Sequence, residues 1–297
     1  MHHRSTSRAP TRTVMAALAA GALLGTLAPS AQSHQGLEAA AAARYAFEPN
    51  PRLSLQTGKP ALMAWNRKRA FLIVNKEGER LGELVDFVID RQTGRLSHTA
   101  LVLEQDGKAV CTKALPVREL RWDAGTQRFR SLLSRAGIES LPDFSTAWLG
   151  RLELGTRQVI EAGHRPLDDE IGFHAPRFVL AGDVEGATVE AEDGDVGSGL
   201  GVILDMNPGE AAYFLLGSGD HRSGELFPIP WNALVPTADG GYAVPKSVRE
   251  MMRAPAISKE LIASLTMAGF RMEVANYYGV PSRIDQRLQR VLNKSGS

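Results

Sequence analysis

Residues 74–94, VNKEGERLGELVDFVIDRQTG, return in altered form as residues 189–209, VEAEDGDVGSGLGVILDMNPG. Both stretches close with an aspartate, three further residues and a glycine. Asp90 and Asp205 are 115 residues apart (205 − 90), and the two closing glycines have the same separation. Solenoid units repeat at roughly 20–50 residues. A period this long therefore predicts two copies of one small domain.

The likeness extends beyond these stretches. Residues 115–120 (LPVREL) are matched by residues 229–234 (IPWNAL), and residues 141–144 (LPDF) by residues 254–257 (APAI). We therefore expect the two copies to superpose strand on strand. The expected matching positions are Gly78 on Gly194, Asp90 on Asp205, and Gly94 on Gly209.

Short apolar runs between glycine-containing turns predict β-structure in each copy. In the first copy, the run at residues 84–89 lies between the turn signals KEGE and RQTG, and such spacing favours a small barrel or sandwich. Asp90 and Asp205 each precede a turn glycine by four residues, where a short carboxylate accepts backbone N–H bonds. We expect these two aspartates to build turns, because a calcium loop needs denser acidic spacing and a distal glutamate.

The pattern of apolar strand, Gly-Glu turn, strand closing in Asp, glycine turn, Leu/Ile-Pro strand and short helix resembles the PRC-barrel family. That family includes the cytoplasmic domain of the photosynthetic reaction-centre H subunit and a domain of a ribosome maturation factor. The resemblance covers residues 61–144 and 177–257. It departs from the pattern at Gly201, where the first copy has Asp86, and at the lead-in residues 63–66. The resemblance implies compact β-barrels used for protein contact, with no shared catalytic residue.

The amino terminus predicts export. Three arginines within the first twelve residues precede an apolar run at residues 14–28, and small residues follow. This order is typical of a secretory signal peptide, with cleavage expected after Ser30 or Ser33, whereas a membrane helix needs about 20 apolar residues. Residues 1–33 are therefore predicted to be a signal peptide and residues 34–60 a tether. The predicted location is periplasmic or secreted, and an uncleaved anchor is the alternative.

Charge and cysteine content narrow the function classes. Removing residues 1–33 takes three arginines from 34 basic against 33 acidic residues, leaving 31 against 33 and a net charge of −2. This balance argues against a nucleic-acid partner. The basic cluster at residues 67–69, beside Trp65, is interpreted as a solvated strand edge, with an anionic partner or a lipid headgroup surface as the alternative. Cys111 is the only cysteine, and we expect it to be a small apolar strand residue.

The predicted connector, residues 145–176, holds the densest group of ligand-type side chains. Its histidines are ten residues apart around a proline and an acidic run, which does not match helical or finger-type zinc spacing. We therefore interpret the group as part of a solvated linker and predict no metal site and no cofactor. The residues concerned are His164, Asp168, Asp169, Glu170 and His174.

Residues 258–297 are predicted to form a helical tail. Ser258 is expected to cap a helix beginning at Lys259, and a second helix is expected from Arg283. Ile284, Leu288, Val291 and Leu292 fall on one face of the second helix. This face is expected to pack on a barrel, and docking a second subunit to give a homodimer is the alternative.

Known catalytic motifs are missing from the sequence. Residues 197–201 (GSGLG) follow an acidic turn instead of opening a nucleotide-binding helix, and are expected to form a bulged or mobile strand. The prediction is a mainly β protein, with two tandem small β-barrels and a helical C-terminal tail. We expect a non-enzymatic envelope scaffold that binds an unidentified protein partner. The alternatives are an accessory subunit that caps a membrane electron-transfer complex and a hydrolase with its site in the connector.

Overall fold

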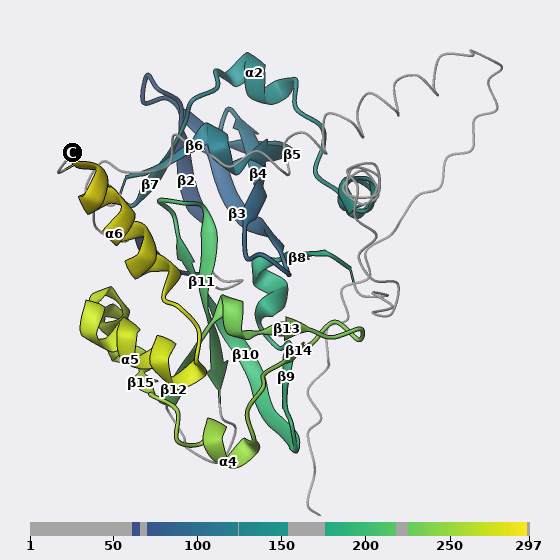
Figure 1. Ribbon diagram of the computed structural model, residues 1–297. Helices are drawn as coiled ribbons and strands as arrows, with labels where there is room; N and C mark the ends of the chain where they lie inside the picture. The colour runs from purple at the N-terminus through teal and green to yellow at the C-terminus, as the bar shows by residue number, and fades with distance from the viewer. Residues whose placement is uncertain (1–60, 66–69, 124, 154–175, 218–224, 296–297) are drawn as a thin grey trace, which may run out of the picture.

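The computed structural model describes residues 61–65, 70–123, 125–153, 176–217 and 225–295. These residues form two sheets and several helices (Figure 1), which confirms the prediction of a mainly β protein. The first sheet has the order β5-β4-β3-β2-β7-β6. Its strands are β2 (Phe71–Val74), β3 (Arg80–Asp90), β4 (Leu96–Gln105), β5 (Lys108–Pro116), β6 (Leu120–Asp123) and β7 (Arg128–Ser131), with η1 (Val117–Glu119) after β5 and α2 (Arg135–Glu139) after β7.

The second sheet repeats this plan, in the order β13-β14-β9-β10-β11-β12-β15. Short helices follow β12 and β14, as η1 follows β5 and α2 follows β7 in the first repeat. The strands are β9 (Thr188–Ala191), β10 (Gly194–Asp205), β11 (Glu210–Gly217), β12 (Glu225–Pro230), β13 (Val235–Pro236), β14 (Tyr242–Ala243) and β15 (Ile257–Ser258), and the helices are η3 (Trp231–Ala233) and α4 (Val248–Met251).

The strand register repeats with the 115-residue displacement seen in the sequence. Val88 of β3 lies opposite His98 of β4, and Ile203 of β10 lies opposite Tyr213 of β11. The irregularities in the two ladders also correspond, which ties the second repeat to the first residue by residue. The shifts fall between Leu84 and Asp86 and between Val88 and Ile89 in the first repeat, and between Gly199 and Gly201 and between Ile203 and Leu204 in the second.

Each repeat contributes its first strand to the sheet of the other repeat. β1 (Leu62–Trp65) pairs with β10, where Ala64 lies opposite Ile203. In return, β8 (Phe178–Leu180) pairs with β3, where Leu180 lies opposite Val88. The first strand of each predicted domain, residues 62–65 and 178–180, therefore pairs with the sheet of the other domain. Hydrogen bonding decides the placement of these strands, and composition alone does not encode it.

The two aspartate turns meet between the sheets. The backbone N–H of Leu96 donates to the carbonyl oxygen of Gly209 at 2.8 Å, and the N–H of Ala211 donates to that of Gly94 at 2.7 Å. Residues 96 and 211, and residues 94 and 209, are both 115 apart. Reciprocal contacts of this kind define an isologous interface. The chain therefore has an internal approximate two-fold axis between the turns.

Most of the buried apolar side chains form one cluster that spans both sheets. Trp65, 1% exposed, packs edge-on against Phe87 with ring centroids 5.0 Å apart. Trp231 of the second repeat donates from Nε1 to the Arg91 carbonyl oxygen at 3.0 Å. A Cβ at Gly94 would lie 2.7 Å from the Trp231 ring, so this turn position needs glycine for space as well as for its positive φ.

Three further helices follow the second repeat: η4 (Lys259–Thr266), α5 (Ala268–Tyr278) and α6 (Arg283–Ser295). Ile284 is 3% exposed and Leu288 packs against the shared core, so these two residues of α6 face the protein's own interior. Ser258 precedes η4 without a side-chain capping bond, so its predicted role as a helix cap is wrong. The side chains of Val291 and Leu292 lie outside the described part of the tail.

The predicted connector is not wholly a linker. Residues 146–153 are helical, and Trp148 and Leu152 of this helix pack in a second small cluster with Val88 and Phe178. The apolar side chains Trp148 and Leu152, four residues apart, were a signal that sequence reasoning passed over. One predicted match also shifts, because Gly78 lies in the turn before β3 whereas Gly194 is the first residue of β10.

Substitution of the paired bulge glycines tests this duplicated geometry. Gly82 (φ 153°) and Gly197 (φ 132°) are 115 residues apart, and a Cβ on either would collide with a backbone carbonyl oxygen across the sheet. We expect Gly82→Ala and Gly197→Ala each to lower the free energy of unfolding by about 3 kcal/mol, from positive-φ strain plus overpacking. Gly78→Ala, with open space around it, should cost about 1 kcal/mol. Urea unfolding measures all three, and equal losses would contradict the register described above.

Candidate functional site

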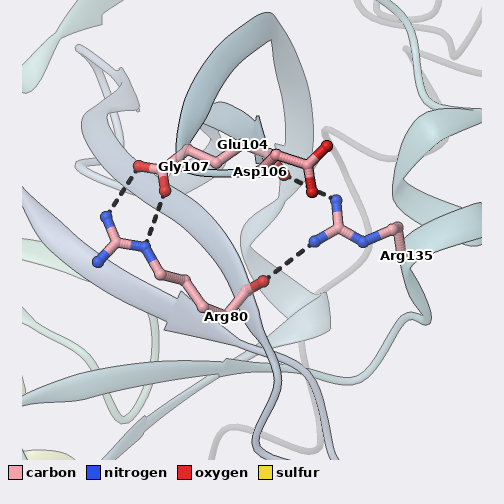
Figure 2. Close-up of a pocket in the computed structure, with 5 residues that line it drawn as sticks. All are labelled: Arg80, Glu104, Asp106, Gly107 and Arg135. Carbon is pink, nitrogen blue, oxygen red and sulfur yellow. Dashed lines mark hydrogen bonds and ion pairs between the residues drawn. The ribbon is translucent and has the colours of Figure 1, made fainter.

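A polar hollow of about 450 Å³ lies at the end of β3, β4 and β5. Figure 2 shows Arg80 and Arg135 on opposite sides of it, with Glu104 and Asp106 between them. Arg80 donates to the Glu104 carboxylate from Nε at 2.8 Å and from Nη2 at 2.9 Å. This hydrogen bonding lowers the pKa of Glu104 and raises that of Arg80.

The second arginine of this hollow, Arg135, binds backbone carbonyl oxygens. Arg135 donates from Nη1 to the carbonyl oxygen of Glu104 at 2.9 Å and from Nη2 to that of Arg80 at 3.0 Å (Figure 2). It also donates from Nε to the Glu79 carboxylate at 3.3 Å. Both arginines therefore fasten α2 and two strands together. Their positive charges are already matched by carboxylates, so the hollow offers little attraction to an anion.

A second hollow of about 450 Å³ lies between the end of α4 and the outer side of α5. Tyr277 donates its hydroxyl hydrogen to the Glu250 carbonyl oxygen, which fixes α5 against α4. Desolvation, and then the charge of Glu250, raises the pKa of Tyr277. Met267, immediately before α5, and Met272, within it, are 59% and 53% exposed. The hollow is lined by Arg253, Pro255, Glu273, Asn276 and Tyr277.

The predicted turn role of Asp90 and Asp205 is present in the structure. Asp90 Oδ1 accepts the backbone N–H of Gln92 at 3.0 Å, and Asp205 Oδ1 accepts that of Asn207 at 3.2 Å. Sequence reasoning missed that each aspartate also pairs with an arginine. Arg177, just before β8, donates from Nη2 to Asp90 Oδ2 at 2.7 Å.

The arginine for the second aspartate comes from the tail. Arg287 of α6 pairs with Asp205, which is fully buried, and with Glu210 at 3.1 Å. Ala61 occupies the position that corresponds to Arg177. The carbonyl oxygen of Ala61 accepts the N–H of Met206, and in the first repeat the carbonyl oxygen of Arg177 accepts the N–H of Arg91. Asp205 in the second repeat therefore depends on α6 for its positive partner. Asp90 in the first repeat is instead paired with Arg177, just before the exchanged strand β8.

The remaining predicted residues are dispersed. Cys111 is partly buried in β5 opposite Leu103, and His98 lies opposite Pro116, five residues along the strand and about 17 Å away. Asp193 accepts the N–H of Val248 at 2.6 Å in the turn before β10. The GSGLG segment is a bulged part of β10, as expected. Residues 67–69 and 164–174, with the predicted basic cluster and the ligand-type group, lie outside the described residues.

A scan against protein-family models and a search of curated proteins both return no match to this chain. Among the residues that the structure describes, no three His, Cys, Asp or Glu side chains group as a metal site would require. None of the described helices has the length and apolar character needed to cross a membrane. The exposed large apolar side chains of the described residues include Met267, immediately before α5, and Met272, within it.

Replacing the tail arginine should destabilise the protein strongly. Arg287→Met keeps most of the aliphatic stem but leaves the buried Asp205 without its cation. We expect a loss of about 3 kcal/mol in the free energy of unfolding, as for other buried pairs with one partner removed. Arg290→Met, on the exposed side of the same helix, should change it by less than about 0.5 kcal/mol. Chemical denaturation compares the two, and equal effects would mean that the pair does not hold α6.

Acid titration should reveal the buried His98. Burial, and then the positive charge of Arg118, lowers its pKa to about 3. Because the unfolded chain binds this proton near pH 6.5, folding should lose about 1.4 kcal/mol per pH unit as the pH falls from about 6 toward 3. His98→Phe preserves an aromatic contact with Trp148 and should remove this part of the slope. Unfolding measured from pH 7 to pH 4 checks it, and parallel curves for the two proteins would show that His98 does not titrate this way.

Proposed function

We propose that this protein is a non-enzymatic binding or scaffold module of the bacterial envelope. Its two repeats are proposed to be PRC-barrel-like units, and the repeated register of β3–β4 and β10–β11 supports that assignment. The export-type amino terminus supports a periplasmic or secreted location. The proposed ligand is another protein.

The observation that carries this proposal is the outer side of α5. Met267, immediately before α5, and Met272, within it, are each more than half exposed, and other residues of α5 line the hollow described above. Methionine is flexible and polarizable, and it is frequent on surfaces that adapt to protein partners. Tyrosine and arginine, both present in the hollow, are the residue types that dominate binding energy at interfaces.

The anchoring of α5 makes this face suitable for docking. Arg271, 2% exposed, donates from Nη1 to the carbonyl oxygens of Leu265 and Thr266 and pairs with Asp285 of α6. The buried guanidinium thus ties η4, α5 and α6 into one unit. A rigid helix loses little entropy when a partner binds. The methionines are therefore displayed on a fixed support instead of a loop.

The pair Met267→Ser and Met272→Ser should abolish most partner capture. Each interface anchor typically contributes more than about 1 kcal/mol, so the double variant should retain roughly a tenth or less of the bound partner. The matched control is Val110→Ser with Val235→Ser, since these valines are 58% and 55% exposed elsewhere. Affinity capture from an envelope fraction, quantified for wild type and both variants, measures the effect. Equal loss in both double variants would refute a specific role for α5.

A further inference from the structure

The contact between the repeats has the composition of a binding interface. It consists of two exchanged strands, two reciprocal turn-to-turn hydrogen bonds and a shared apolar core. The exchanged strands carry side chains that are nearly fully buried, among them Met63, Trp65 and Phe178, at 5%, 1% and 4% exposure. Removing side chains of this size from water favours association of the repeats. The interface is thus apolar, and its hydrogen bonds fix the register.

The two described ends of the chain on either side of the connector lie close together. The backbone N–H of Arg177 donates to Glu153 Oε1 at 2.9 Å, so the described chain ends on either side of residues 154–175 are in contact. Twenty-two residues (175 − 154 + 1) join these ends, whereas an extended chain of that length reaches about 70 Å. The connector is far longer than the distance it bridges.

We propose that the two repeats are binding partners in their own right, and that the strand-accepting edge of each recognises the first strand of the other. The accepting edges are the ends of β3 and β10, next to the two aspartate turns. The kind of partner that such an edge fits is the complementary repeat of a second copy of this chain. Within one molecule the connector raises the local concentration of the partner repeat to about the millimolar range, which keeps the exchange intramolecular in dilute solution.

Cutting the connector tests whether the repeats hold together unaided. A protease site is inserted within residues 154–175 of the full chain, in a Cys111→Ser background, and the protein is cut under native conditions. We expect the two halves to co-elute in gel filtration as one complex with 1:1 stoichiometry, and to separate only in denaturant. Separation of the halves in native buffer would overturn the proposal.

Engineered disulfides distinguish strand exchange from simple contact. The N–H of Met206 donates to the Ala61 carbonyl oxygen, and hydrogen-bonded pairs alternate along an antiparallel ladder. Ala64 and Ile203 therefore form one of the closer, non-hydrogen-bonded pairs, where a disulfide fits. Ala64→Cys with Ile203→Cys should link the two halves of the cut protein on oxidation. The control is Ala64→Cys with Val88→Cys, because Val88 is the counterpart of Ile203 in the first repeat's own sheet, and this pair should not react.

Mixing tests recognition between molecules. Cut Ala64→Cys protein and cut Ile203→Cys protein, each first shown to unfold cooperatively, are unfolded together in urea, diluted and oxidised. We expect disulfide-linked pairs that contain the amino-terminal half of one protein and the carboxy-terminal half of the other. Reassembly without this product, or a disulfide in the Ala64–Val88 control, would show that the accepting edge does not recognise a strand from a second copy.

Discussion

The exchange of β1 and β8 between the two sheets is the constraint on which the rest of the structure depends. β10 is buried from Val202 to Asp205, and its N–H and C=O groups on one side are satisfied by β1. Unpaired buried backbone groups are costly, so β10 cannot keep its place without a strand from the first repeat. The same holds for β3 and β8. Neither sheet is complete until both are formed, and the aspartate turns are brought together as a result.

The departures from internal symmetry show how the second repeat has come to depend on the tail. Where Arg177 neutralises Asp90, the corresponding position near Asp205 is Ala61, and Arg287 of α6 supplies the cation. A buried carboxylate without a partner is strongly unfavourable, so α6 is part of the folded unit (Figure 1). Arg283 adds a hydrogen bond at 2.6 Å to the Thr93 carbonyl oxygen in the first repeat's turn. The tail therefore holds both repeats at their junction.

The sequence predicted the features that depend on local geometry and missed those set by distant partners. Turn glycines and strand-end aspartates are visible because positive φ and N–H capping restrict residue type at a single position. The four residues of β1 carry no signal for which sheet accepts them. For the same reason the sequence placed Trp65 beside a basic cluster, whereas its side chain lies in the core. The arginine partners of the two aspartates are 82 and 87 residues away along the chain.

The turns, ion pairs and glycine bulges of the two repeats mostly hold the fold together. Partner recognition is therefore left to other parts of the surface. The aspartates and their arginines lie at or near the junction, and the bulge glycines allow close backbone approach within each sheet. In the polar hollow of the first repeat, both arginines are already paired with carboxylates. By contrast, Met267 and Met272, before and within α5, are exposed apolar side chains. A surface that is rigidly supported yet unused by the fold is where partner recognition can be selected without loss of stability.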